Sequence, residues 1–360
     1  MKGTLRFLFL YEVAEAIRLD ALRSTLKAPI TESPATVSPH VPQYLHFERP
    51  PVVERIDVVL LSGGVRLDAR AKYYDYGVLS IELELPFECD WNSLVSQASA
   101  WIGAAELENR ATELLRTALK SSAPALARPY EHWLREDYFI VQISEIPASY
   151  GAPVPAKELL ASHAHEIAQL VRGESVTLSD AECQEVLQSS ISYSQTDLLV
   201  VGWSGALVYG SSEVSTTTVQ LLEYANTQLL ELRYYDSFLT RLLEDVYRSL
   251  EHKSGVAAPW RLSREAERVN TIRLDVMELT EKVDNAIKFL SDMFYARLYG
   301  LAAAKVGVPD YRRLVDQKLR TAGELYRFMV EQFNQTRSFI LELTVVLILF
   351  LELFFLFRGK

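Results

Sequence analysis

The amino-acid sequence predicts an α+β head with a mostly antiparallel sheet, then a long helical, coiled-coil-like arm and one C-terminal transmembrane helix. Three observations support this fold class. Strand and helix patterns alternate over residues 1–210, apolar residues recur at spacings of three and four over residues 211–337, and residues 338–358 are almost entirely apolar. The predicted domains have these same limits.

Proline and charge are distributed unevenly along the chain, which supports a division near Gly210. The 360 residues carry a net charge of −10. Residues 1–210 contain 12 prolines and 27 acidic against 17 basic residues, whereas residues 211–360 contain two prolines and 20 residues of each charge. The net negative charge therefore belongs to the head, and this balance argues against direct binding of nucleic acid.

The head is expected to begin with a buried strand at residues 5–13, where an apolar run follows Lys2. Asp20 is placed to cap a short helix that ends near Lys27. A loop rich in proline, serine and threonine follows at residues 28–51. Two strand-like runs at residues 55–61 and 65–72 then flank a Ser-Gly-Gly turn and predict a hairpin.

The remaining elements of the head follow the same alternation. A third strand at residues 76–85 is expected to stop at Pro86. Apolar spacing predicts one helix over residues 91–120, a strand at 138–146 and another helix at 156–171. Short apolar runs at residues 198–201 and 206–209 bracket a Gly-Trp-Ser-Gly turn and predict a second hairpin.

The second part of the chain is predicted to be almost entirely helical. Heptad-like apolar seams run through residues 222–250 and 269–294, separated by glycine and proline breaks. A last helix is expected to run from Asp310 into the apolar segment, with Pro309 at its start. The seams predict helices that pack at shallow angles, either within the chain as an antiparallel hairpin or between chains.

The C-terminal apolar segment is long enough to cross a membrane. As a helix, residues 339–357 would span about 28 Å, close to the ~30 Å hydrocarbon core of a bilayer. The polar residues within and beside it are Arg337, Glu342, Glu352, Arg358 and Lys360. The basic residues can reach the polar interface, whereas Glu352 is expected to be protonated, to face a partner helix or to be drawn towards the interface. A buried core helix or an oligomerisation zipper is the alternative.

No motif in the sequence predicts a catalytic, metal or cofactor site. His163 and His165 are two residues apart, and a helix would direct them to opposite sides. Ser204 lacks the second spacer of a nucleophile elbow. Cys89 and Cys183 have no Cys-x-x-Cys partner and no neighbouring histidine in the sequence, so both are expected to be reduced thiols. We therefore expect no catalytic residue, no metal ligand and no cofactor.

Several stretches resemble the "required for meiotic nuclear division" family, a group of membrane proteins with a domain of unknown function. The tail LELTVVLI at residues 341–348, followed by Leu351 and Glu352, is similar to the C-terminal signature of that family. Residues 11–15 with 19–22 resemble its first strand and helix, and residues 76–78 resemble its third strand. The chain departs from the family at residues 80–81, which lack the usual aromatic pair, and at 309–311, which lack a tryptophan.

This resemblance implies an α+β domain, a helical arm and a single C-terminal membrane helix. Eukaryotic members of the family are mitochondrial inner-membrane proteins linked to translation, and the family offers no enzymatic residues for this chain.

The sequence thus predicts a membrane-tethered scaffold or adaptor that self-associates through its arm or membrane helix. Its acidic head would face an unknown protein partner in the cytoplasm, or in the mitochondrial matrix if the protein is organellar, because no export signal is recognised. The alternative is a tail-anchored enzyme with its site in the head. The expected partners are the lipid bilayer, further copies of the chain and that unknown protein, without direct contact to nucleic acid.

Overall fold

A computed structural model describes residues 1–26, 30–31, 49–147, 153–251, 264, 266–274, 276–277, 281 and 293–358. The chain divides into two compact units. The first is formed by Met1–Tyr234 and Lys282–Tyr311, and the second by Tyr235–Glu281 and Arg312–Lys360. The division into a head, an arm and an anchor as separate domains stays a prediction.

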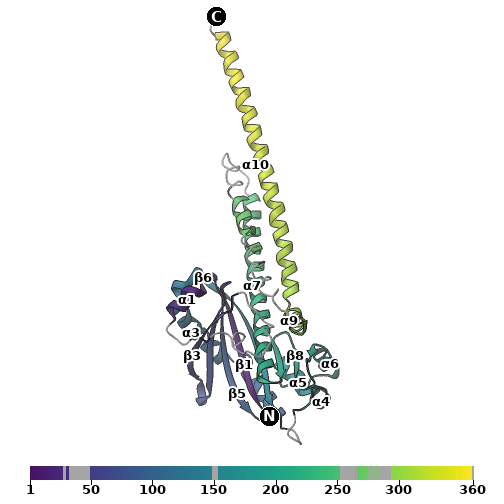
Figure 1. Ribbon diagram of the computed structural model, residues 1–360. Coiled ribbons are helices and arrows are strands. Elements are labelled where there is room, and N and C mark those ends of the chain that lie inside the picture. The colour runs from purple at the N-terminus through teal and green to yellow at the C-terminus, as the bar shows by residue number, and fades with distance from the viewer. Residues whose placement is uncertain are drawn as a thin grey trace. The chain divides into compact units, whose positions relative to one another are not determined.

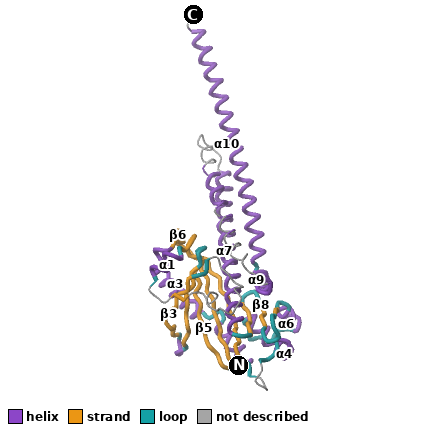
Figure 2. Tube along the Cα trace, in the orientation of Figure 1, coloured by secondary structure: helices purple, strands orange, loops and turns teal. Residues whose placement is uncertain are grey.

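The first unit is built on a nine-stranded sheet with the order β2-β3-β4-β5-β1-β6-β9-β8-β7 (Figures 1 and 2). The strands are β1 (Lys2–Ile17), β2 (Ile30–Thr31), β3 (Val52–Leu60), β4 (Arg66–Tyr73), β5 (Val78–Glu88), β6 (Leu126–Glu145), β7 (Ser190–Ile191), β8 (Leu198–Val201) and β9 (Gly205–Tyr209). Neighbouring strands are antiparallel except β6 and β9, which are parallel. The prediction of a mostly antiparallel sheet is therefore confirmed.

Helices accompany the sheet along the described chain. They are α1 (Leu19–Thr25), α2 (Trp91–Trp101), α3 (Ala105–Ser122), α4 (Ala156–Ser162), α5 (Ala164–Arg172), α6 (Asp180–Leu187), α7 (Ser212–Glu251), α9 (Met293–Val306) and α10 (Val308–Arg358). Short 3₁₀ helices occupy η2 (Ser62–Gly64) and η3 (Ala123–Ala125). Mixed sheet followed by helices is thus the observed order along the sequence.

β1 lies at the centre of the sheet and divides its side chains between two faces. Its odd-numbered residues from Leu5 to Val13 join residues of α2, α3, α5 and α6 in one apolar core. Its even-numbered residues lie on the opposite face and include Arg6 and Glu12, because successive side chains of a strand alternate. The strand predicted at residues 5–13 is confirmed, and it is longer than predicted at both ends.

β5 continues through Pro86, where the sequence predicts that the strand ends. Its pairing with β4 stops at Glu84, while its pairing with β1 continues and places Pro86 opposite Thr4. Proline has no N–H to donate, so a strand tolerates it where one edge has no partner. The stop expected at Pro86 is wrong for this reason.

Two helices predicted as continuous are each divided. Residues 102–104 interrupt the helix predicted at 91–120, and Gly103 there has a φ of 76°. His163, with φ −132°, separates α4 from α5 within the helix predicted at 156–171. Asp20 does not cap α1, because Arg18 holds the N-cap position and Asp20 lies in the first turn.

Both predicted hairpins are confirmed, as β3–β4 and β8–β9. The strand predicted at residues 138–146 is the second half of β6, whose first half the sequence does not predict. Helix α6 is also not predicted. Most of the loop expected at residues 28–51 lies outside the described residues.

The described residues of the second unit are helical. They comprise residues 235–251 of α7, residues 264, 266–274, 276–277 and 281, and α10 from Arg312 onwards. Lys318 Nζ on α10 lies 2.5 Å from Asp236 Oδ1 and 2.6 Å from Thr240 Oγ1 on α7. The prediction of a helical second part is confirmed, whereas parts of the break and seam at 252–292 lie outside the described residues.

Candidate functional site

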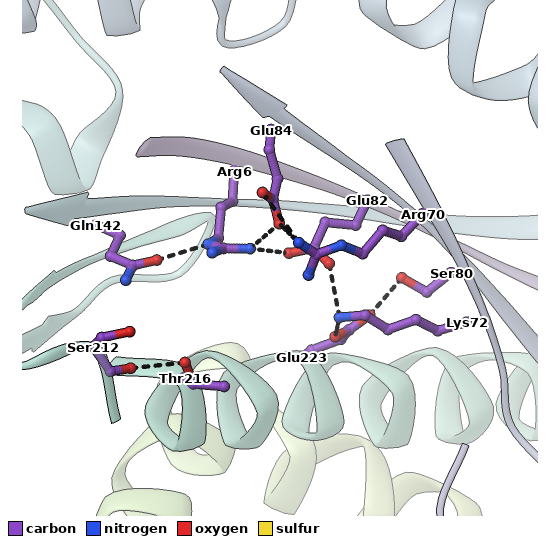
Figure 3. Close-up of polar contacts among 10 residues, drawn as sticks. All are labelled: Arg6, Arg70, Lys72, Ser80, Glu82, Glu84, Gln142, Ser212, Thr216 and Glu223. Atoms are coloured by element: carbon purple, nitrogen blue, oxygen red, sulfur yellow. Dashed lines mark hydrogen bonds and ion pairs between the residues drawn. The ribbon is translucent and has the colours of Figure 1, made fainter. Parts of the chain in front are cut away.

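The first half of α7 buries polar side chains along its length. Glu223, Asn226, Thr227, Gln228 and Glu231 are each at most 3% exposed. Buried polar groups are costly unless hydrogen bonds or opposite charges compensate for the lost water. The even-numbered face of the sheet provides such partners, and its charged side chains point towards α7 (Figure 3).

Six charged residues form an ion network between the sheet and α7. They are Arg6 on β1, Arg70 and Lys72 on β4, Glu82 and Glu84 on β5, and Glu223 on α7. Arg6 Nη1 lies 2.6 Å from Glu82 Oε1 and also contacts Glu84. Lys72 Nζ lies 2.9 Å from Glu82 Oε2 and donates a hydrogen bond to Glu223. Three cations thus balance three carboxylates.

Strand register explains why these charges meet. Glu84 lies opposite Arg6 on β1, and Glu82 lies opposite Arg70 on β4. Opposite charges on neighbouring strands of one face lie close enough to interact. Polar neighbours complete the network, because Glu223 Oε1 accepts a hydrogen bond from Ser80 Oγ at 2.6 Å and Arg6 Nε donates to Gln142 Oε1 at 2.8 Å.

Glu82 and Lys72 are both charged at neutral pH. Burial disfavours ionisation of Glu82, but Lys72 and Arg6 outweigh this effect and lower the pKa of Glu82 to about 2. Burial likewise opposes the charge of Lys72, yet Glu223 and Glu82 raise its pKa above the usual range. Each ionised group is therefore compensated, and the network is suited to holding α7 on the sheet rather than to proton transfer.

A different arrangement lies further along the same interface, around Glu12 of β1 and Glu231 of α7. Both side chains are 1% exposed. Burial raises the pKa of Glu12 well above its usual range, and the charge of Glu231 raises it further. Within the described part of the chain, Glu12 Oε2 accepts no hydrogen bond.

Two tyrosines contact α7 within four residues of Glu231. Tyr76, in the turn before β5, and Thr227 of α7 form a hydrogen bond of 2.7 Å between their hydroxyls. Tyr130 of β6 and Tyr234 of α7 stack with ring centroids 4.7 Å apart. Because Thr227, Glu231 and Tyr234 are spaced by four and three residues, they share one face of α7.

Gly77 shapes the backbone beside Glu12. Its φ is 98°, and a Cβ atom there would lie 1.9 Å from Ala14 O and 3.3 Å from Glu12 Oε1. Only glycine fits so close an approach in this conformation.

The structure brings His165 and Cys183 together, although the sequence predicts no histidine near either cysteine. His165 Nδ1 lies 3.2 Å from Cys183 Sγ, and its Nε2 lies 3.5 Å from Asp180 Oδ1. The sequence does not reveal this contact, because packing of α5 on α6 joins residues 18 positions apart. Burial raises the pKa of Cys183, and Asp180 adds to this rise, so the thiol is protonated and poorly nucleophilic at neutral pH.

His163 and Ser204 lie in surroundings that indicate a structural role. His163 stacks on Trp91 with ring centroids 4.5 Å apart. Ser204 lies in the turn between β8 and β9. Within the described residues, no group of three or more His, Cys, Asp and Glu side chains is arranged to hold a metal ion.

A small pocket opens where β1, β6 and the α2–α3 junction meet. Its volume of 40 Å³ has room for a few water molecules, and Phe9, Trp101 and Tyr138 contribute to its lining. Arg135 and Glu108 form an ion pair within that lining. The pocket therefore adds no reactive group to the site.

The polar residues predicted beside the membrane segment lie on α10. Arg337, Glu342, Glu352 and Arg358 are exposed, and Lys360 lies outside the described residues. Arg358 is placed over the ring of Phe354, 5.7 Å from its centroid. In the described part of the chain, α10 is the one helix long and apolar enough to cross a membrane, and none of its apolar window is buried.

These features define a class of protein with a mixed, mostly antiparallel sheet, a polar sheet–helix interface and a C-terminal apolar helix. The chain belongs to the family described as the N-terminal domain of uncharacterized protein MJ0711, whose model matches residues 2–216. It is similar to uncharacterized protein MJ0711 of Methanocaldococcus jannaschii, with 23% identity over 187 residues.

That similarity covers 52% of this chain and 57% of the archaeal protein, so the chain spans little more than half of its relative's length. No solved structure matches the chain. The resemblance to the meiotic nuclear division family stays a prediction, because neither match bears on it.

Proposed function

We propose that the protein is a membrane-anchored scaffold or adaptor that self-associates and presents its acidic, sheet-bearing unit to a protein partner. Helix α10 is the observation that carries this proposal. Its residues 339–357 are all exposed, and only Glu342 and Glu352 among them are charged. Exposed apolar surface is unfavourable in water by about 25 cal/mol per Å², so a stretch of this length favours lipid or other helices.

The chemistry of the first unit favours a binding role over catalysis. The ion network between the sheet and α7 is charge-balanced, and each charged side chain in it has a close partner. The thiol beside His165 is protonated at neutral pH, as its raised pKa indicates. An enzyme with its site in the head is the alternative. Turnover of a substrate that is lost when a side chain within residues 1–210 is replaced would favour this alternative.

The proposal includes self-association of the chain and a reducing compartment. The membrane helix is the exposed apolar surface through which copies would associate as a helix pair, whereas the seam residues of α7 from Leu222 to Val246 are buried within the chain. Both cysteines are free, which supports a reducing compartment such as the cytoplasm or an organelle matrix.

Membrane fractionation tests the anchor. We expect the full chain to remain with membranes after extraction with alkaline carbonate. A double variant, Leu347→Arg with Ile348→Arg, should be released, because each arginine at the centre of a span costs about 3 kcal/mol or more. The matched control, Leu314→Arg with Gln317→Arg, adds the same charge to exposed positions of α10 outside the apolar segment and should stay bound. Release of the unmodified chain by carbonate would overturn the proposal.

A further inference from the structure

The apolar segment of α10 contains polar side chains that differ in whether the helix itself satisfies them. The hydroxyl of Thr344 donates a hydrogen bond of 2.8 Å to the carbonyl oxygen of Ile340 in the same helix. Glu342 and Glu352 form no ion pair and no hydrogen bond with any residue that the structure describes. In lipid, the two carboxyl groups are therefore the polar groups of this segment that need a partner.

The two acids lie on the same side of α10. At 3.6 residues per turn, positions that are ten residues apart lie about 80° apart around the helix axis. The side chains that share this side are separated by three and four residues, the spacing through which two parallel helices pack. We call them the acidic face, and they are Glu342, Val345, Leu349, Glu352 and Leu356.

The acidic face points away from the stripe through which α10 packs within the second unit. The buried side chains of that stripe are Val315, Leu319, Ala322 and Met329. The acidic face lies roughly 150° from them around the helix axis. Lys318, which bonds to Asp236 and Thr240, is on the side of the stripe. A contact along the acidic face therefore leaves the bonds between α10 and α7 in place.

The side of α10 that carries the acidic face is also exposed before the apolar segment begins. α10 is one continuous helix from Val308 to Arg358 (Figure 1). The exposed polar residues on this side are Gln317, Arg320, Glu324, Glu331 and Gln335. Within the described chain, this side of the helix is thus free for a contact with another molecule.

We propose that two copies of the chain pair in parallel along the acidic face within the bilayer, with their Glu352 carboxyl groups hydrogen-bonded to each other. This inference rests on the proposed membrane anchor and names the surface through which copies associate. Copies inserted in the same direction present Glu352 at the same depth, and a protonated carboxyl group donates a hydrogen bond to the other. Because residues 339–357 contain no basic side chain, the second copy offers a hydrogen bond and not an ion pair.

The pairing is confined to the apolar segment. Glu324 and Glu331 lie on the same side of α10 but outside that segment, where water solvates them. In a parallel pair each would face an identical charge of the other copy, and like charges repel. The contact between copies therefore begins near Ser338.

Disulfide cross-linking of the full chain in membranes of an expression host tests this inference. Cys89→Ser and Cys183→Ala first remove the two native thiols. Single cysteines are then placed on the acidic face by Val345→Cys, Leu349→Cys or Leu356→Cys, and on the opposite side by Leu343→Cys, Leu347→Cys or Phe354→Cys. Each opposite position is two residues before its partner, which shifts it by only about 3 Å in depth. Under a mild oxidant, we expect dimers from the acidic-face set and few from the opposite set, because a disulfide requires Cβ atoms about 4 Å apart.

Variants of Glu352 test the role of its carboxyl group in the Leu349→Cys chain. Glu352→Leu should weaken the dimer about five- to thirtyfold, as expected for loss of one hydrogen bond between helices in lipid. Glu352→Gln retains a hydrogen-bonding side chain of similar shape and should preserve cross-linking. Glu342→Leu is the control, because Glu342 lies close to the end of the apolar segment and its loss should change cross-linking much less.

Carbonate extraction of the same cysteine variants separates this inference from the anchor on which it rests. If the variants stay with the membranes but both sets cross-link equally, or only the opposite set does, pairing along the acidic face is wrong and the anchor stands. The absence of dimers at every position would also overturn the pairing, and would leave the acids to a helix of another protein. Release of the variants by carbonate would overturn the anchor and this inference together.

Discussion

Glu82 and Glu12 show how the same residue type acquires opposite properties at two positions of one sheet face. Both are at most 1% exposed. Lys72 and Arg6 compensate the charge of Glu82 and lower its pKa to about 2, whereas burial and a second carboxyl raise the pKa of Glu12. Alternation along a strand predicts which face each residue occupies, but not which charge it will meet there.

The ion pairs of Glu82 lead to a prediction for stability. Glu82→Gln should lower the free energy of unfolding by about 3 kcal/mol or more at pH 7, because it leaves Lys72 and Arg6 with one carboxylate fewer in a buried site. Urea denaturation measures this change. Glu15→Gln is the control, since Glu15 pairs with Arg128 at an exposed position and should cost less than about 1 kcal/mol.

The effect of Glu82 also depends on pH. Since its folded pKa is lowered, its stabilising contribution is full above 4.5 and disappears as pH falls through about 2. The unmodified chain and Glu82→Gln should therefore converge in stability towards pH 2. A difference that is unchanged between pH 7 and pH 2 would contradict the charged state assigned to Glu82.

At the scale of elements, apolar periodicity predicts strands and helices, but it does not predict where local backbone geometry interrupts a helix. The strand at residues 5–13 and both hairpins follow from alternation and glycine turns. The breaks at Gly103 and His163 do not interrupt the apolar spacing, so a pattern of apolar residues cannot reveal them. The first half of β6 is mostly exposed or half-buried and lacks the clear alternation that predicts a strand.

Within the second unit, Lys318 connects α10 to α7 and provides a test of that contact. Its ammonium donates hydrogen bonds to Asp236 Oδ1, to Thr240 Oγ1 and, at 3.1 Å, to the carbonyl oxygen of Asp236. Lys318→Met should destabilise this helix contact by about 1–3 kcal/mol, because it removes charge-assisted hydrogen bonds from a half-buried site.

Trypsin digestion of the full chain in micelles would detect this change as faster cleavage within residues 235–251 and 312–330. Lys305→Met is the control, because Lys305 makes a long contact of 3.4 Å with Glu185 at the surface of the first unit. Equal cleavage rates in the two variants would contradict a stabilising role for Lys318.

At the scale of the whole molecule, the candidate site joins segments that are far apart in the sequence. Lys72 and Glu223 are 151 residues apart, and Arg6 and Glu82 are 76 apart. Each of these residues has an ordinary local context, so no motif marks them. The apolar segment of α10 is predictable from sequence alone because its signal is contiguous and does not depend on tertiary packing.

Depth within that segment distinguishes its two acids. As a helix, Glu342 lies about 5 Å from Phe339 along the axis, whereas Glu352 lies about 20 Å from Phe339 and about 8 Å from Phe357. Glu342 therefore reaches the polar interface more readily. The carboxyl group of Glu352 therefore has the greater need of a hydrogen-bonding partner within the lipid. A second copy of α10 presents the same carboxyl group at the same depth.

Glu352→Leu should accordingly shift the detergent-solubilised protein towards the monomer, and Glu342→Leu should change its mass much less. Loss of one interhelical hydrogen bond of about 1–2 kcal/mol corresponds to a roughly five- to thirtyfold weaker dimer. Sedimentation equilibrium at several protein-to-detergent ratios measures this shift. If both variants retain the oligomeric state of the unmodified chain, association of the copies through Glu352 is wrong.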